Sequence, residues 1–580
     1  MARRVPPTTR IETVTEVIHG HTVTDDYRWL EGDNSNPARM GTSTPEVAAW
    51  TAEQNAYTRS VLDALPGRAE LEERMRPLLR AGAVSIPHLR GERAFYLRRS
   101  GDENQAVAYG RDGTGTERVL IDPFTLDPTG LTTITWLSPD HTGTLLAYGT
   151  YSAGDENTSL HLLEVESGAT LPLVIPNKVN PPMWLPDGSG FVYRNLADPT
   201  NPYSGQVMHH RLGTEQDELL YRQLTPDEDA ALATTWGPDA RLSSDGRWLV
   251  LTYATFALSN DVWLLDLDAY RRDGSLERRE VSRGTVGNAS GTVKGDTLYL
   301  FTFKGAPNGR VIAVDTASPH EGDWRDLIPE RGDAAIASVT FTKRHIMVNY
   351  LRAASNTLEA FDLDGRSAGV VPLPGIGTVV TMSNEGSDSA FFEFSSFNHA
   401  PTIFRFDAAH PTAAPEPWAR VESPVDMDSV VVSQAWYDSA DGTKVSMFIA
   451  HRRGLVLDGT NPTILSGYGG FGVSETPQFS ATLFPWFEDG GVYAVPNLRG
   501  GGEYGDAWHE AGMLRNKQNV FDDFAAAARW LIDNGYTSSE RLAALGRSNG
   551  GLLTGAALTQ WPELFRAVIV GVPLLDMLRF

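Results

Sequence analysis

The spacing of hydrophobic positions changes twice along the chain, near residues 80 and 415. Between Pro45 and Leu79 apolar residues recur at helical spacing, with a break at Pro66-Gly67, so the first segment is expected to be mostly helical after an irregular start. In the middle, short alternating stretches separated by polar turns predict strands. In the last part, apolar strands alternate with helical patterns. The expected domain boundaries divide the chain into residues 1–78, 79–415 and 416–580.

A turn that contains aspartate recurs ahead of an apolar strand in the middle part. These turns contain Asp140, Asp187, Asp245 and Asp296, which lie 47, 58 and 51 residues apart. That interval is close to the length of a four-stranded β-propeller blade. Counting the possible units up to Phe406 gives six or seven blades, and β-sandwich domains are the alternative interpretation.

The last part has the pattern of an α/β sheet. A proline-rich run from His410 to Trp418 is typical of a linker. A helix is predicted over Val520–Asn534, with Gly535 placed to end it. The expected strands are Val445–Ala450, Thr463–Ser466, Gly491–Val495, Leu542–Leu545 and Ala567–Val570. One buried strand between successive helices predicts a mostly parallel sheet.

The composition is that of an ordinary globular protein, with 41% hydrophobic and 21% charged residues. At 580 residues the chain is too long for a single hydrophobic core. The net charge of −24 argues against a nucleic-acid partner. No apolar stretch approaches the roughly 18 residues of a membrane span, and no apolar run follows the basic start, so we expect a cytoplasmic protein without a membrane partner. The absence of cysteine excludes disulfides and thiolate metal sites, and no cofactor is expected.

The candidate chemistry lies in the segment Gly546–Gly551, which fits the G-x-S-x-G motif around Ser548. The motif requires a strand before it and a helix after it, and Leu552–Thr559 has the composition of such a helix. The glycines are needed because the turn is strained and its ends pass close to each other. When a serine on such a turn belongs to a catalytic triad, the other two triad residues follow it in the chain, first an aspartate or glutamate and then a histidine. No histidine follows Ser548, and Asp576 is the only aspartate after it, so the nucleophile is present without its base.

Five segments occur in one order along the chain, and together they closely resemble the prolyl oligopeptidase family of serine peptidases. They are Tyr27–Glu31, Gly467–Phe471, Asn497–Gly505, Asn516–Phe524 and Gly546–Gly551. The resemblance implies an α/β-hydrolase domain whose mostly parallel sheet is incomplete at its C-terminus. An all-β seven-bladed propeller is inserted into it, and the N-terminal segment is the first piece of the hydrolase domain.

The resemblance also implies roles for individual residues. Ser548 matches the nucleophile, and Asn549 matches the position whose backbone N–H donates to the oxyanion, as the elbow geometry alone also suggests. Tyr468 matches the tyrosine whose hydroxyl is the second oxyanion donor, and Phe471 matches an aromatic residue that borders the substrate pocket. In the family the acid, the histidine and a substrate-stacking tryptophan lie beyond the position of Phe580. The chain is therefore expected to be a truncated piece that is nearly inactive as it stands.

The implied activity is cleavage of short peptides after proline by a monomeric serine oligopeptidase. Arg547 departs from the glycine that proline-specific members usually carry, and some members of the oligopeptidase B group have arginine there. Cleavage after basic residues is therefore one alternative. A non-catalytic propeller-based peptide-binding protein is a second alternative, and an esterase or acylaminoacyl-peptidase relative is a third.

Two further features have simpler structural interpretations. The segment Arg499–Glu503 is rich in glycine but lacks the Lys-Ser/Thr pair of a phosphate-binding loop. It is expected to form a tight crossing below the active site, with Arg499 and Glu503 in structural salt bridges. His509, the nearest histidine upstream of the elbow, is expected to be structural rather than a substitute base. The pair His209-His210 has no metal-ligand spacing.

Overall fold

The computed structural model describes residues 5–35, 41–256, 259–284, 288–383 and 386–578. It divides into two compact units, one made of residues 1–79 with 574–580 and the other of residues 80–573. Within the described residues, none of the helices combines the length and the apolar character needed to cross a membrane.

The first unit combines a β-hairpin with helices. β1 (Val14–Ile18) pairs antiparallel with β2 (His21–Asp25) through the turn His19-Gly20, whose φ angles of 50° and 81° are both positive. Such a two-residue turn matches the twist of the strands. The helices are η1 (Arg28–Glu31), α1 (Pro45–Leu62) and α2 (Arg68–Met75). The predicted helices and their break are confirmed, whereas the hairpin lies where the sequence pattern predicted only irregular structure.

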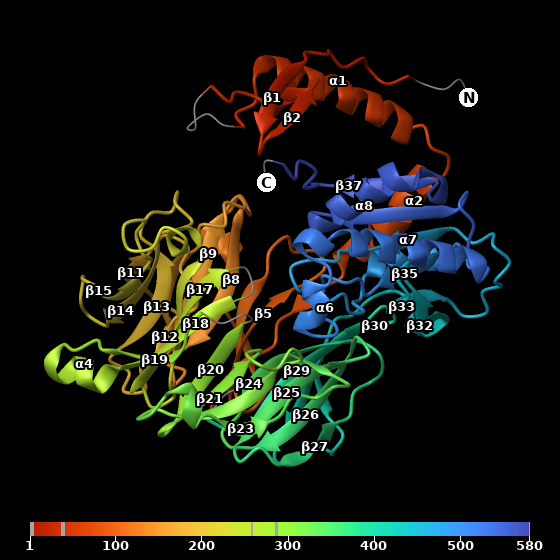
Figure 1. Cartoon of the computed structure of the whole chain (residues 1–580). Helices are drawn as coiled ribbons and strands as arrows, with labels where there is room; N and C mark the ends of the chain where they lie inside the picture. Colours follow the sequence, from red (N-terminus) through yellow and green to blue (C-terminus); the bar gives the residue numbers. More distant parts are fainter. Residues whose placement is uncertain (1–4, 36–40, 257–258, 285–287, 384–385, 579–580) are drawn as a thin grey trace. The chain divides into compact units, whose positions relative to one another are not determined.

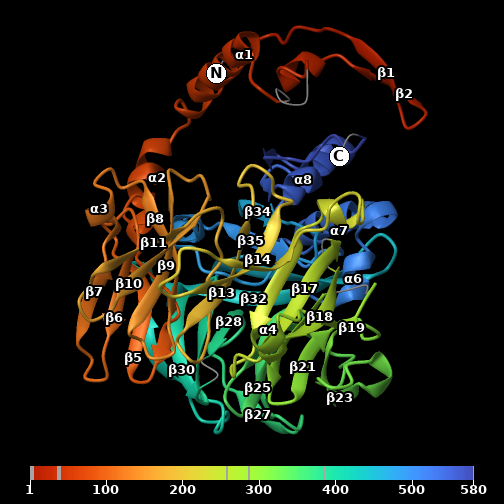
Figure 2. The same cartoon turned by 90° about the vertical axis from the view of Figure 1, so that its left-hand side faces the viewer.

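Seven antiparallel sheets follow one another as propeller blades, coloured from orange to cyan in Figures 1 and 2. Blades 1 and 2 contain β3 (Ala83–Val84), β4 (His88–Arg90), β5 (Arg93–Arg99), β6 (Val107–Arg111), β7 (Glu117–Ile121), then β8 (Thr132–Pro139), β9 (Leu145–Ser152), β10 (Ser159–Glu164) and β11 (Thr170–Ile175). Blades 3 and 4 contain β12 (Met183–Trp184), β13 (Gly190–Leu196), β14 (Gly205–Arg211), β15 (Glu218–Arg222), then β16 (Gly237–Leu242), β17 (Trp248–Phe256), β18 (Ser259–Asp266) and β19 (Arg278–Ser282). Blades 5 and 6 contain β20 (Ala289–Lys294), β21 (Thr297–Thr302), β22 (Arg310–Asp315), β23 (Arg325–Ile328), then β24 (Ala335–Phe341), β25 (His345–Arg352), β26 (Ser355–Asp362) and β27 (Ser367–Val371). Blade 7 contains β28 (Thr378–Ser383), β29 (Ser389–Ser396), β30 (His399–Asp407) and β31 (Glu416–Arg420).

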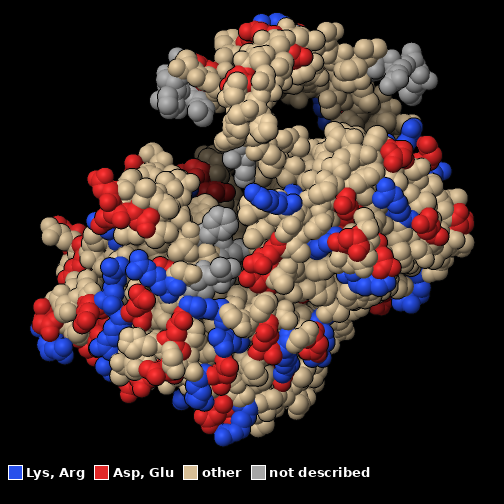
Figure 3. All heavy atoms as spheres, viewed as in Figure 1, with Lys and Arg blue, Asp and Glu red and all other residues tan. Residues whose placement is uncertain are grey.

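Each blade is built from strands that are consecutive in the chain, so blades 1 and 7 meet through side chains. Ile86 packs with Phe391 and Ile403 in one buried cluster that joins them. The short helices of this region are η3 (Leu78–Arg80), α3 (Pro123–Leu126), η4 (Leu232–Thr234), α4 (Leu267–Asp273) and η5 (Glu321–Asp323). Basic and acidic side chains are interspersed on the face of the propeller that Figure 3 shows. The prediction of a seven-bladed propeller is confirmed.

The aspartate turns lie where the repeat predicts, between the first two strands of blades 2 to 5. In the first of them, Asp140 Oδ1 accepts hydrogen bonds from the N–H groups of Thr144 and Leu145, at 2.8 and 2.9 Å. A carboxylate that binds the backbone of its own turn fixes the hairpin without help from the core. The repeat therefore marks the innermost hairpin of each of these blades.

The proline-rich run is not a linker, which corrects the prediction for His410–Trp418. Its last residues belong to β31, the outer strand of blade 7, which extends past the predicted boundary at residue 415. Pro417 is tolerated there because an edge strand need not donate every backbone N–H to a neighbour.

The α/β part contains one six-stranded sheet in the order β32-β33-β35-β34-β36-β37. Its strands are β32 (Val430–Asp438), β33 (Lys444–Arg452), β34 (Thr463–Ser466), β35 (Val492–Pro496), β36 (Leu542–Arg547) and β37 (Ala567–Gly571). The last four strands pair parallel, and the first two join antiparallel, so the predicted sheet is confirmed with β32 as an addition. Its helices are η6 (Met427–Ser429), η7 (Ala481–Leu483), α5 (Phe484–Glu488), α6 (Asp506–Glu510), η8 (Leu514–Asn516), α7 (Gln518–Asp533), α8 (Asn549–Gln560) and η9 (Pro562–Leu564).

Helix α7 anchors the core of this part. Its side chains Val520, Phe524, Ala528 and Leu531 are fully buried and belong to the same cluster as residues of β33, β34, β35 and β36. Burying each large apolar side chain contributes about 1.5–3 kcal/mol. This packing holds the sheet and the connections at its edge, where the candidate site lies.

Candidate active site

Ser548 occupies a strained turn between β36 and α8. Its φ of 56° and ψ of −120° lie in a region that non-glycine residues rarely adopt. A Cβ added to Gly546 would lie 2.0 Å from the carbonyl oxygen of Gly550, and one added to Gly550 would lie 2.5 Å from that of Gly467. The two glycines therefore allow the close approach that the sequence motif implied, and the expected strand, turn and helix are all present.

The strain leaves the Ser548 side chain exposed at the sheet edge while its backbone is fixed. Its N–H donates to the carbonyl oxygen of Gly571 at 3.0 Å, and its own carbonyl oxygen accepts from the N–H of Gly551 at 2.8 Å. Among the described residues, the Ser548 hydroxyl has no hydrogen-bond partner, and no histidine or carboxylate contacts it. The hydroxyl is therefore exposed to solvent at a fixed position.

Two hydrogen-bond donors without partners lie on the segments beside this turn. The backbone N–H of Asn549, the first residue of α8, makes no hydrogen bond within the described residues, and neither does the hydroxyl of Tyr468. The side chain of Asn549 is buried, and its Nδ2 donates to the carbonyl oxygen of Tyr468 at 2.6 Å. The turn Gly546–Gly550 (the elbow) and the loop Gly467–Phe471 after β34 (the Tyr468 loop) are thus joined directly.

A lysine joins the same two segments. Lys517 Nζ donates to the carbonyl oxygen of Gly469 at 2.7 Å and to Asn549 Oδ1 at 3.0 Å. Burial lowers the pKa of Lys517 to about 8. Lys517 belongs to one of the segments that carry the resemblance, but no sequence pattern indicates its role, because a side-chain bridge between distant segments has no local signal.

Phe471 ends the Tyr468 loop as a residue that is 46% exposed, with a backbone φ of 55°. An exposed aromatic ring in a strained backbone conformation is a candidate contact for an apolar ligand. The next residue, Gly472, donates its N–H to the carbonyl oxygen of Gly500 at 3.0 Å. His509 Nδ1 lies 2.8 Å from the same oxygen, so His509 contacts the backbone of these loops rather than Ser548.

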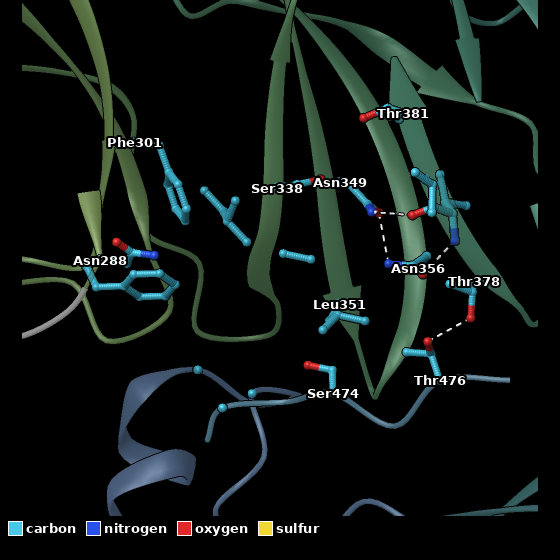
Figure 4. Close-up of a pocket in the computed structure, with 18 of the residues that line it drawn as sticks. Asn288, Phe301, Ser338, Asn349, Leu351, Asn356, Thr378, Thr381, Ser474 and Thr476 are labelled. Atoms are coloured by element: carbon cyan, nitrogen blue, oxygen red, sulfur yellow. Dashed lines mark hydrogen bonds between the residues drawn. The ribbon is translucent and has the colours of Figure 1, made fainter. Parts of the chain in front are cut away.

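A cavity of about 590 Å³ lies between these loops and propeller blades 5 to 7. The loops contribute Gly472, Ser474, Thr476 and His509, and Ser548 is not among the described residues that line it. Figure 4 shows the hydrogen bond of 2.7 Å by which Thr378 of β28 joins Thr476 across this boundary. The propeller and the α/β part therefore share one chamber beside the Tyr468 loop.

The propeller side of the cavity combines apolar rings with amides. Phe301 and Leu351 line it together with Asn349 and Asn356, whose side chains are joined by a hydrogen bond of 2.9 Å (Figure 4). Asn349 Nδ2 also donates to the carbonyl oxygen of Val379 at 3.0 Å. Asp506 and His509 are the only titratable side chains in the described lining, so the chamber suits largely uncharged ligands. Within the described residues, no group of three or more potential ligands could hold a metal ion.

Comparison with protein families follows the same division of the chain. The family model described as the prolyl oligopeptidase N-terminal β-propeller domain matches residues 6–417, and the prolyl oligopeptidase family model matches residues 477–580. The chain belongs to the prolyl oligopeptidase family. The resemblance stated from the sequence is confirmed, and with it the hydrolase fold that carries an inserted propeller.

Individual members of the prolyl oligopeptidase family match over nearly all of the chain. The prolyl endopeptidase of Elizabethkingia meningoseptica is 33% identical, over 99% of this chain and 79% of that protein. A solved structure from a study of two prolyl endopeptidases and their inter-domain dynamics superposes with a TM-score of 0.89 at 37% identity, over 99% of this chain and 83% of that one. Prolyl oligopeptidase B of Galerina marginata, solved with a 35-residue substrate bound, gives a TM-score of 0.87 at 26% identity and the same coverage.

Proposed function

We propose that this chain carries the nucleophile and oxyanion donors of a serine endopeptidase that hydrolyses short peptides on the carboxyl side of proline. The observation that carries the proposal is the elbow at Ser548, with an unpaired N–H on Asn549 and an unpaired hydroxyl on Tyr468 among the described residues. Relatives named prolyl endopeptidase support the preference for proline. The chamber, whose described lining has only Asp506 and His509 as titratable side chains, supports peptide ligands without strong charge.

The proposed reaction is acyl transfer. Ser548 Oγ attacks the scissile carbonyl carbon, and the hydroxyl proton passes to a base. The oxyanion accepts hydrogen bonds from the Asn549 N–H and the Tyr468 hydroxyl, and the amine leaves with a proton as the acyl-enzyme forms. Water then attacks the ester carbonyl and releases the carboxylic acid and Ser548. Phe471 would border the pocket of the residue before the cleaved bond.

We also propose that the 580-residue chain by itself turns over peptides very slowly. No base contacts Ser548 within the described residues, and loss of the triad base lowers turnover on the order of 10⁶-fold in a well-studied hydrolase. A test of the nucleophile therefore has to be independent of turnover. A peptide aldehyde meets this need, because it forms a hemiacetal with the serine hydroxyl at equilibrium whether or not a base accelerates the step.

The first prediction concerns an N-acylated dipeptide that ends in prolinal. It is expected to bind the chain about 100-fold more tightly than the matching alcohol, because tetrahedral adducts resemble the transition state that the site stabilises. Ser548→Ala is expected to remove this difference and leave the affinity for the alcohol unchanged. Isothermal titration calorimetry with both ligands measures the ratio.

The control variant is Ser290→Ala, which changes an exposed serine of β20 in the propeller and should keep the ratio. Equal affinities of aldehyde and alcohol in the unmodified chain would contradict the proposed nucleophile. Tighter binding of the arginine aldehyde than of the proline aldehyde would instead favour cleavage after basic residues. Alcohol binding without any gain from the aldehyde is the result expected of a non-catalytic peptide-binding protein.

A second prediction concerns the oxyanion donor on the Tyr468 loop. Tyr468→Phe is expected to reduce the aldehyde-to-alcohol affinity ratio about tenfold, because it removes one hydrogen bond to the adduct oxygen and little else. The alcohol lacks that oxygen, so its affinity should stay the same. An unchanged ratio in this variant would remove Tyr468 from the proposed site while leaving Ser548 in it.

A further inference from the structure

The two proposed oxyanion donors belong to segments that are far apart in the sequence. Tyr468 lies in the loop after β34, and Asn549 is the first residue of α8, 81 positions later. Oxyanion donors are effective only when both reach the same developing charge at about 2.7–3.1 Å. A misplacement of 1 Å can cost about 100-fold in rate. The site therefore depends on the contacts that hold these two segments at a fixed separation.

Lys517 completes a closed set of hydrogen bonds between them. Its ammonium donates to the carbonyl oxygen of Gly469, the residue after Tyr468, and to the side-chain oxygen of Asn549, the residue after Ser548. The amide nitrogen of the same Asn549 side chain donates to the carbonyl oxygen of Tyr468. The oxygen of the Asn549 side-chain amide thus accepts from Lys517, and its nitrogen donates to the Tyr468 loop.

The local chemistry shows that this lysine is not placed for stability alone. Both of its acceptors are neutral, and it has no salt bridge with a carboxylate among the described residues. A half-buried ammonium without a counter-ion costs free energy that an apolar side chain of the same length would avoid. The lowered pKa of Lys517 reflects the same cost. What the ammonium provides, and an apolar side chain cannot, is two donors aimed at two separate segments.

We propose that Lys517 is a positioning residue for the oxyanion site, holding the Tyr468 loop and the Asn549 elbow at the separation that the adduct requires. The proposal rests on the function proposed above for Ser548, Tyr468 and Asn549. Lys517 itself need not touch the substrate. Its effect is expected in the binding of a tetrahedral adduct and not in the binding of a ligand that lacks the adduct oxygen.

The test compares the proline aldehyde and its alcohol in Lys517→Met. Methionine keeps the length and the apolar stem of lysine but removes the donors. The aldehyde-to-alcohol affinity ratio is expected to fall about tenfold, which is less than the roughly 100-fold cost of a 1 Å misplacement. The affinity for the alcohol is expected to remain within twofold, which also reports that the variant is folded.

A chemical restoration separates the ammonium from the packing of the stem. The chain has no cysteine, so Lys517→Cys introduces a single thiol. Alkylation with 2-bromoethylamine forms a carbon–sulfur bond, releases bromide and restores an ammonium at the length of lysine. Alkylation with 1-iodopropane also forms a carbon–sulfur bond and releases iodide, and it gives an apolar side chain of the same length without a hydrogen-bond donor. The first product should recover most of the affinity ratio, and the second should not. Lys444→Cys, at an exposed lysine of β33, is the matched control. Its aldehyde-to-alcohol affinity ratio should change with neither reagent.

The outcomes distinguish the two proposals. If the unmodified chain binds aldehyde and alcohol equally, the nucleophile proposal fails, and the positioning role, which rests on it, is overturned with it. If the unmodified chain prefers the aldehyde and Lys517→Met keeps the full preference, the positioning role is overturned. It is also overturned if both alkylated products recover the preference equally, because filling space would then be sufficient. A loss of alcohol binding together with unfolding in Lys517→Met would assign the residue to stability, unless the 2-bromoethylamine product alone restores the ratio.

Discussion

Replacing Arg499 by methionine is expected to lower the free energy of unfolding of the α/β part by about 3–5 kcal/mol. The Arg499 side chain is 5% exposed, and its partner Asp523 on α7 is fully buried. Three hydrogen bonds join the two side chains: Nη2 to Oδ1 at 2.6 Å, and Nε to Oδ2 at 3.0 Å and to Oδ1 at 3.2 Å. Without the guanidinium, the Asp523 carboxylate keeps, among the residues that the structure describes, only the hydroxyl of Ser439 and the backbone N–H of residue 499. A buried charge with so little compensation is strongly destabilising.

The second carboxylate on Arg499 provides the matched control. Asp441 accepts from Arg499 Nη1 at 2.5 Å, but its side chain is 48% exposed, so water can replace the arginine. Asp441→Asn is therefore expected to cost less than about 1 kcal/mol. The double variant Arg499→Met/Asp523→Asn should recover much of the loss of Arg499→Met, because it removes both buried charges together.

Hydrogen exchange of the α7 amides is the suitable measurement, because a chain with several domains need not unfold in one step. Protection of α7 should fall in Arg499→Met and return in the double variant, while protection of the propeller strands stays unchanged. Equal effects of Arg499→Met and Asp441→Asn would show that the buried pair is not the element that matters.

The regular part of the fold follows from local patterns in the sequence. Asp140 and its equivalents mark the blade hairpins because each carboxylate binds its own turn, which is a property of a few adjacent residues. The helix α7 and the parallel strands follow from the period of their apolar residues. The hairpin of Val14–Asp25 also has a local signal, alternating residues around His19-Gly20, but the apolar spacing of the later helices dominates the pattern of this segment.

The partners of buried polar groups do not follow from local patterns. The motif placed Ser548 and the glycines of the elbow, since the turn requires them within a few residues. It did not reveal that Asn549 and Lys517 join the elbow to the Tyr468 loop, because those contacts exist only after the sheet has formed. The prediction of salt bridges in the segment Arg499–Glu503 shows the same limit. It is confirmed for Arg499 and wrong for Glu503, which has no basic partner among the described residues.

Glu503 is instead a buried carboxyl group that favours its neutral form. It is 1% exposed, and its Oε2 has no hydrogen-bond partner in the described part of the chain. Its Oε1 accepts from the N–H of Glu475 at 2.7 Å and lies 3.5 Å from Asn497 Nδ2. Burial raises the pKa of Glu503 to about 8, and the nearby Glu475 carboxyl adds to the increase. Burial also raises the pKa of Glu475.

The stability of the α/β part is therefore expected to fall between pH 4.5 and about pH 8. In the unfolded chain Glu503 loses its proton near pH 4.5, whereas in the folded protein it keeps the proton up to about pH 8. The folded state binds more protons in this window, so stability decreases as the pH rises and levels off at either end. At about 1.4 kcal/mol for each pH unit, the Glu503 contribution amounts to about 3–5 kcal/mol across the window.

Glu503→Gln is expected to remove the Glu503 part of this dependence, because glutamine keeps the shape of the protonated acid and cannot ionise. The variant should match the original protein near pH 4.5 and exceed its free energy of unfolding by about 3–5 kcal/mol near pH 8. Urea unfolding at several pH values, followed by hydrogen exchange in the α/β part, measures the difference between the two proteins. Groups that titrate elsewhere cancel in that difference.

An exposed glutamate gives the matched control for the same substitution. The Glu540 side chain is 80% exposed and pairs only loosely with Arg566, at 3.8 Å. Glu540→Gln should retain the pH dependence of the original protein. If Glu503→Gln retains it as well, Glu503 is charged in the folded state and a cation or water must reach its Oε2. If only Glu503→Gln loses it, the Glu503 carboxyl is held neutral by its burial. The α/β part then has its greatest stability in mildly acidic solution.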